Sequence, residues 1–341
     1  MLLRGIKKHG RILFLLAVFA VTMWSVFGGE DLREIAAALQ TANPAYIYPS
    51  ILCVVLFILG DSVAIHYLLR SLGTRVSFRH CCLYSFIGFF YCCITPSASG
   101  GQPMQVVAMR KDKIPVAVST VVLAIVTILY KLVLVLIGLA VVIIRPRVIM
   151  GYLSSTEALV YLGLVLNVIC IALLLLLVFH PRIFRLCAEK TLALVQKFRP
   201  FRHPEKIFAR LDGVVGQYTG AADYYRTHHW VIIVVFLITL VQRCLLFLVT
   251  WLTYRAFGLT GESLLTILLL QAMISVAVDM LPLPGGMGIS ENLFLTMFLP
   301  IFGAELVLPG MVISRGISYY TQLLISAVMT VAASFIIRKQ D

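Results

Sequence analysis

The stretch "YCCITPSASGGQPMQ", residues 91–105, interrupts an apolar region at the point where it should be halfway across a lipid bilayer. As helices, the run over 81–95 would be about 22 Å long and the run over 103–113 about 16 Å, against about 30 Å of hydrocarbon. Neither arm can span the bilayer, but each can reach its middle and turn back. The stretch therefore predicts a re-entrant helical hairpin over residues 81–110.

Proline and glycine are expected to build the turn of this hairpin. Pro96 would end the first arm, and Pro103 suits the first position of the returning helix, where its missing N–H costs nothing. Between them, Ser99, Gly100 and Gly101 permit a tight turn.

A second broken region, residues 262–300, repeats this plan around "DMLPLPGGMGISENL", residues 279–293. Two prolines are expected to stop the first arm and three glycines to turn the chain: Pro282 and Pro284, then Gly285, Gly286 and Gly288. Ser290 is a plausible N-cap of the returning helix.

The composition excludes a soluble protein. Hydrophobic residues make up 61% of the 341 residues and charged residues only 13%, with a mean hydropathy of +0.99. An ordinary soluble domain has about 25% charged residues. Six uninterrupted apolar segments are predicted to span the membrane: 12–27, 46–69, 114–144, 158–179, 230–254 and 307–337.

The basic residues predict the topology. With both broken regions as hairpins and the N-terminus inside, 21 of the 28 lysines and arginines fall in cytoplasmic stretches, as the positive-inside rule requires. The order of spans and hairpins is then the same in residues 1–150 and 151–341, but with opposite orientation. The predicted fold is an all-α polytopic membrane protein of two inverted-topology repeats, with six full spans and two re-entrant hairpins.

Residues 180–229 are the one sizeable segment outside the membrane. Apolar residues recur from Pro204 at helical spacing, and basic residues fill the gaps. This pattern predicts amphipathic helices on the inner leaflet, where they would meet anionic lipids; a solvated linker over the cytoplasmic face is the alternative. The net charge of +13 is explained by such loops, so nucleic acid is not expected as a partner.

Six ionisable residues lie within the membrane segments or beside the second turn: Lys131, Arg243, Arg315, Asp61, Asp279 and Glu291. Each is costly at a lipid-facing position, so we expect these side chains to face inward. Structural ion pairs are one interpretation, for example Lys131 with Asp61. Taken together, the three cations favour a phosphate-binding function, with the carboxylates as a charge relay or as ion-pair partners.

Helix N-termini near the bilayer midplane provide free N–H groups and a positive dipole end. The candidate substrate-binding residues are Lys131, Arg243, Arg315, Ser99, Gly100, Gly101, Gln102, Gly285, Gly286 and Ser290. The alternative for the turns is a packing kink between close helices. The amides Asn167, Gln242, Gln271 and Gln322 are expected to bridge helices rather than to contact a substrate.

Two motifs resemble a known family. One is "LPLPGGMGISE" with the Arg315-containing helix that follows it, and the other is "TPSASGGQP" with the basic stretch "MRKDK" that follows it. The family is the lysylphosphatidylglycerol synthase transmembrane region, the flippase-like membrane domain of bacterial lysyl-phosphatidylglycerol synthases. The resemblance covers essentially the whole chain and implies a bacterial cell membrane; the topology predicted from the basic residues places both termini in the cytoplasm. In the family this domain moves an aminoacylated phospholipid between leaflets, while a separate soluble domain transfers lysine from tRNA to phosphatidylglycerol. The chain stops a few residues after its last span, so we expect a stand-alone member without the synthase domain.

Three functions are open at this point. The first is a flippase for an anionic or aminoacylated phospholipid, without a cofactor or metal. The second is an intramembrane lipid transferase or a component of a phosphatidylglycerol lysyltransferase, with Asp279 and Glu291 as acid and base. The third is an accessory subunit for a separate synthase that docks on residues 180–229; a homo-oligomer is also possible.

Overall fold

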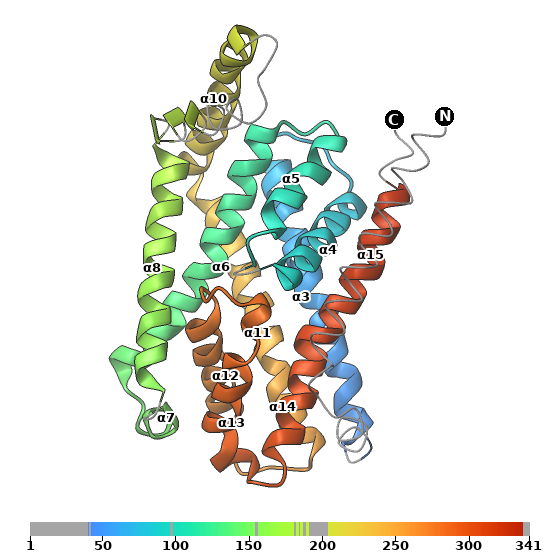
Figure 1. Ribbon diagram of the computed structural model, residues 1–341, viewed down its shortest axis with the longest axis vertical. Coiled ribbons are helices and arrows are strands. Elements are labelled where there is room, and N and C mark those ends of the chain that lie inside the picture. Colours follow the sequence, from blue (N-terminus) through green and yellow to red (C-terminus); the bar gives the residue numbers. More distant parts are fainter. Residues whose placement is uncertain are drawn as a thin grey trace.

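The structure is a computed structural model that describes residues 42–95, 98–153, 156–180 and 204–336, with residue 40 and a few positions between 182 and 190. Over these residues the chain forms helices and no strands, which confirms the all-α class. Long helices run side by side along the longest axis, and shorter ones pack between them (Figure 1). The predicted span 12–27 and Pro96 lie outside the described residues.

Five helical segments in the described part of the chain are long and apolar enough to cross a membrane. They coincide with the predicted spans: α3 (Pro44–Ser71), α6 (Val116–Ile144), α8 (Glu157–Phe179), α11 (His229–Ala256) and the run Val307–Ala333. The last run contains a π-helical segment that the sequence pattern does not predict. It comprises α14 (Val307–Arg315), the π-helical η3 (Gly316–Thr321) and α15 (Gln322–Ile336).

The first broken region forms two short helices, α4 (Phe78–Ile94) and α5 (Gly101–Lys111). Asp112, directly after α5, accepts a hydrogen bond from the Tyr84 hydroxyl, and its Oδ2 lies 2.8 Å from Nδ1 of His80. His80 and Tyr84 are in the first two turns of α4, so α5 returns to the end where α4 begins. The new helix starts at Gly101, so Pro103 is its third residue and not its first as predicted; the first turn needs no N–H donor there either.

The second broken region forms α12 (Leu264–Val278), the 3-10 turn η2 (Pro284–Gly286) and α13 (Ile289–Phe302). The Tyr254 hydroxyl accepts the backbone N–H of Glu262, just before α12, at 3.0 Å. The Tyr254 ring contacts that of Phe302, the last residue of α13, with 5.5 Å between centroids. The start of α12 and the end of α13 therefore meet around Tyr254.

The caps of the second turn differ from the prediction. Gly285 and Gly286 have the positive φ expected of turn glycines, 58° and 67°. However, α12 ends at Val278, ahead of both prolines, with Asp279 as its cap. The predicted N-cap Ser290 is wrong: the N-cap is Gly288, whose φ of 82° only glycine adopts cheaply and which starts α13 two residues earlier.

Buried amides bridge the long helices, as predicted. The Gln242 side chain on α11 donates to the Phe57 carbonyl on α3 at 2.9 Å, and Gln271 on α12 accepts from Thr250 on α11 at 3.0 Å. Asn167 on α8 donates to the Val276 carbonyl of α12 at 3.4 Å. Gln322 is buried as well.

The helix predicted from Pro204 is present as α10 (Pro204–Thr227) and lies at one end of the bundle (Figure 1). Its last turns pack on protein: the hydroxyl of Tyr218 donates to the Leu177 carbonyl and that of Tyr225 to the Leu68 carbonyl, at 3.1 and 2.7 Å. The opposite end holds α7 (Arg147–Leu153), whose Tyr152 donates to Glu262 at 2.8 Å. The helical bundle thus has two distinct ends, one that carries α10 and one that carries α7.

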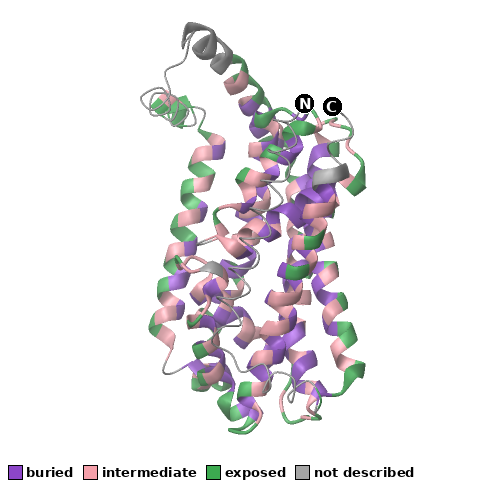
Figure 2. Cartoon of the chain, turned by 45° about the vertical axis from the view of Figure 1, so that its right-hand side comes forward, coloured by how far each residue is buried: buried purple, intermediate pink, exposed green. Residues whose placement is uncertain are grey.

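Exposed apolar side chains follow the outer face of α8, where Figure 2 shows exposed residues along much of its length. They include Leu162, Val165, Val168, Ile169, Leu173 and Leu176. A soluble protein does not leave a face of this size uncovered, whereas acyl chains of a bilayer match it.

Candidate functional site

Lys131 and Asp279 form a partly buried ion pair inside the bundle. Lys131 lies near the middle of α6, and its Nζ is 2.6 Å from Oδ2 of Asp279, the residue that caps α12. The two side chains are 12% and 17% exposed. The pairing of Lys131 with Asp61, given above as an alternative, is therefore wrong.

Arg243, near the middle of α11, approaches the same carboxylate from another side. Its guanidinium carbon lies 3.3 Å from the ring centroid of Tyr130, and its side chain is only 4% exposed. The closest approach to Asp279 is 3.7 Å between Nη2 and Oδ1, which is too long for a hydrogen bond. Among the described residues, Nε and Nη2 of Arg243 have no hydrogen-bond partner. Two cations thus share one carboxylate.

Arg315 is fully engaged in a second cluster. Its Nε and Nη2 both lie 2.9 Å from Oε1 of Glu291, and Nη2 also donates to the Gly285 carbonyl at 3.0 Å. The Ser290 hydroxyl donates to the other oxygen of Glu291 at 2.9 Å. This cluster joins the first turn of α13 to η2 and to the end of α14, and so fixes the second turn.

Asp61 is a buried carboxylate on α3 that faces neutral groups. Ser85 on α4 and Gln105 on α5 are its polar neighbours, and both are buried. Asp61 forms no ion pair with a described residue within 4 Å. It belongs to the packing between α3 and the first broken region.

The first turn is held largely by its own atoms. The Thr95 hydroxyl accepts the Gly100 N–H at 2.9 Å, and the Gln102 amide donates to Thr127 on α6 at 3.2 Å. Gly101 lies against the sulfur of Cys92 and the Gly88 carbonyl, and Ser99 is exposed.

The two broken regions meet inside the bundle. Tyr319, in the π-helical segment, donates its hydroxyl to the Cys93 carbonyl at the end of α4, at 2.8 Å. Around this bond Phe90, Cys93, Tyr319 and Leu323 form a buried apolar cluster, against which Met287 of the second turn packs. The end of α4 also contacts η2 directly.

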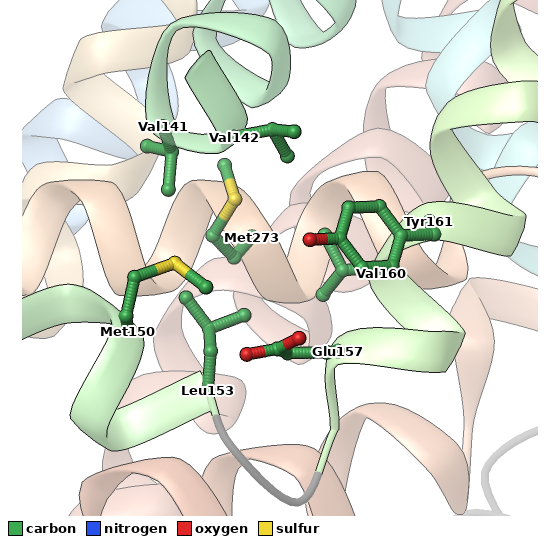
Figure 3. A pocket seen from close by; sticks show the side chains of 8 residues that line it. All are labelled: Val141, Val142, Met150, Leu153, Glu157, Val160, Tyr161 and Met273. Carbon is green, nitrogen blue, oxygen red and sulfur yellow. The ribbon is translucent and has the colours of Figure 1, made fainter. Parts of the chain in front are cut away.

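One pocket lies elsewhere in the bundle. It is small, and Figure 3 shows that Met150, Leu153 and Met273 point into it along with the Glu157 carboxyl. Its lining comes from α6, α7, α8 and α12, and none of the six ionisable candidates takes part. A more open groove of about 490 Å³ lies between α10 and the ends of α3 and α6.

The predicted site residues therefore fall into two clusters and a turn. Lys131, Arg243 and Asp279 gather in one cluster; Arg315, Glu291, Ser290 and Gly285 gather in the other, and Gly286 lies beside Val278. The sequence analysis missed Tyr130, Cys92 and Tyr319. Tyr130 is next to Lys131 in "LYKLVLV", which is the signal that points to it.

A comparison with protein families decides the affiliation of this helical bundle. The family described as the lysylphosphatidylglycerol synthase TM region matches residues 12–326, nearly the whole chain.

The chain belongs to this family. The resemblance inferred from the two glycine- and proline-rich motifs is confirmed, and both motifs lie within the matched range. The comparison with curated proteins finds no match. As a member of the lysylphosphatidylglycerol synthase TM region family with five apolar helices of spanning length in its described part, the protein is a multi-pass membrane protein.

Proposed function

We propose that this protein is a flippase that moves an anionic or aminoacylated phospholipid, of the lysyl-phosphatidylglycerol type, between bilayer leaflets. The observation that carries the proposal is the pair of cations, Lys131 and Arg243, that share the single carboxylate of Asp279. Both cations lie near the middle of helices of spanning length, so the bilayer midplane is their expected depth. A net positive charge at that depth is costly in free energy, and a bound anion would lower this cost.

The proposed architecture is a pair of inverted repeats, residues 1–150 and 151–341, each with a re-entrant hairpin. Two sets of contacts support it: Asp112 brings α5 back to the start of α4, and Tyr254 joins the start of α12 to the end of α13. Paired half-helices of this kind place a binding site between the repeats of many transporters, where access can alternate.

In this proposal the headgroup passes the Lys131–Arg243 cluster while the acyl chains stay among lipids outside the bundle. The headgroup phosphate takes up contacts that Asp279 now makes with Lys131 and fills the free edge of Arg243. Because the cations exchange one anion for another, the headgroup can leave again without a large free-energy barrier. We further propose a bacterial cell membrane, both termini in the cytoplasm and α10 at the inner leaflet.

The carboxylates required for the transferase alternative are both engaged: Asp279 contacts Lys131, and Glu291 contacts Arg315. Two carboxylates held by cations are poor acid and base partners, so this observation favours transport.

A liposome assay tests the proposal. Purified protein is reconstituted with a fluorescent or isotopically labelled phosphatidylglycerol or lysyl-phosphatidylglycerol in one leaflet, and the movement and the chemical identity of the lipid are measured. We expect movement of unchanged lipid, reduced at least about tenfold by joint Lys131→Met and Arg243→Met replacement. Chemically altered lipid would instead identify a transferase, and no movement with any lipid would contradict the proposal.

A further inference from the structure

Arg243 and Arg315 present the same edge of the guanidinium group to different surroundings. Nε–H and one N–H of Nη2 point the same way, and this edge fits two oxygens of a carboxylate or phosphate. In Arg315 the edge is filled by Glu291 at 2.9 Å. In Arg243 this edge has no hydrogen-bond partner among the described residues, although the side chain is only 4% exposed.

Buried guanidinium N–H groups without acceptors are costly, because water no longer solvates them. The Tyr130 ring covers one face of Arg243 at 3.3 Å and leaves the in-plane edge to bind an acceptor. Asp279 cannot serve, since its oxygen is 3.7 Å from Nη2 and its other oxygen is held by Lys131 at 2.6 Å. The edge is therefore open to an acceptor that none of the described residues supplies.

The formal charges of the cluster restrict that acceptor. Among the groups that approach one another within 4 Å, Lys131 and Arg243 contribute two positive charges and Asp279 one negative charge, so this cluster carries one net positive charge. A phosphodiester carries one negative charge, whereas a phosphomonoester carries about 1.5 to 2 at pH 7. The second charge of a monoester would face the carboxylate of Asp279 without a cation to balance it. At a depth with weak screening, this repulsion is large.

We propose that Asp279 is the specificity-determining residue of the headgroup site: it admits the singly charged phosphodiester of a phospholipid to Arg243 and excludes a phosphomonoester. The inference rests on the proposed function, because it places the substrate's phosphate in the same cluster. It adds what the cluster selects for, namely the number of charges on the phosphate rather than the rest of the headgroup.

Binding measurements with short-chain lipids test this inference without transport. Purified full-length protein in a non-ionic detergent is titrated at pH 7.5 with dihexanoyl phosphatidylglycerol and dihexanoyl phosphatidic acid by calorimetry. We expect the wild type to bind phosphatidylglycerol at least about tenfold more tightly, since one unbalanced charge near the cluster changes the affinity by this order. Asp279→Asn should remove or reverse that preference by strengthening binding of phosphatidic acid.

Two control variants separate charge selection from loss of structure. Asp279→Glu keeps the charge and should keep the preference for phosphatidylglycerol. Glu291→Gln removes a carboxylate of the other cluster and should leave the ratio of the two affinities unchanged. Equal ratios in the wild type and Asp279→Asn, with binding retained, would overturn the inference, and so would an equal shift in Glu291→Gln.

The outcomes also separate this inference from the flippase proposal. Selective binding without movement of lipid in liposomes would overturn the transport function and leave the site intact. Movement of lipid with an unchanged affinity ratio in Asp279→Asn would overturn the inference and leave transport intact.

Discussion

Arg243 and Arg315 are chemically identical, yet their neighbours give them different tasks. Arg315 is bonded to Glu291 and to the Gly285 carbonyl, so it holds the second turn together. Arg243 stacks on Tyr130 and leaves its bidentate edge free. From the sequence both arginines are predicted to bind the substrate. Helix packing decides which of them keeps a free edge, and residue types alone do not reveal that packing.

Replacing each arginine by methionine should separate these roles. Arg315→Met leaves the partly buried carboxylate of Glu291 without its cation, which should cost on the order of 3 kcal/mol of stability. Arg243→Met should cost less, because Asp279 keeps Lys131 and methionine retains contact with Tyr130. Thermal unfolding in detergent measures both. A larger loss of stability in Arg243→Met would contradict the assignment.

At the scale of the elements, close backbone approaches fix the first broken region. Gly101 begins α5, and a Cβ there would meet the sulfur of Cys92 and lie 2.9 Å from the Gly88 carbonyl of α4. The glycines of "ASGGQP" were interpreted from the sequence as turn residues. At Gly101 the need is instead for a missing side chain where two helices touch, and residue spacing cannot distinguish these reasons.

Gly101→Ala should therefore push α5 away from α4 and cost about 1–3 kcal/mol, as overpacking does. Gly216→Ala is the matched control, because Gly216 is exposed on α10 and a Cβ there meets nothing within 4 Å. It should leave the unfolding temperature equal or slightly higher, since alanine favours helix. An unchanged unfolding temperature for Gly101→Ala would show that the contact between α4 and α5 is loose.

Helix positions were predictable and helix partners were not. Runs of apolar residues set the five described spans and both interruptions to within a few residues. The partner of Lys131 was not predicted, because Asp279 lies 148 residues away and Asp61 is an equally plausible carboxylate by sequence alone. The π-helical segment after Arg315 was missed as well, since its residues fit an ordinary helix equally well.

At the scale of the whole molecule, the connections separate into two groups. Residues 72–77 and 112–115 lie at the end that carries α10, whereas α7 and residues 257–263 and 303–306 lie at the other (Figure 1). The proposed re-entrant architecture requires these groups to face opposite sides of the membrane.

Cysteine labelling in intact bacteria tests this arrangement. Exposed positions at each end are replaced singly by cysteine: Arg75 and Lys113 at the α10 end, Thr260 and Glu305 at the other. A membrane-impermeant maleimide should label the second pair and not the first until the cells are opened, with the wild type giving the background of native cysteines. Labelling of Arg75→Cys and Lys113→Cys on opposite sides would show that α4 and α5 cross the membrane together and would exclude a hairpin.

The bond from Tyr319 to Cys93 uses a main-chain oxygen as its acceptor. Every residue type offers that oxygen, so substitutions at position 93 that fit the space keep the link between the two halves. Position 319 has no such freedom, because only a side chain with a hydroxyl at the same reach can replace tyrosine. Substitution of Tyr319 can thus remove this hydrogen bond, whereas substitution of Cys93 alone cannot.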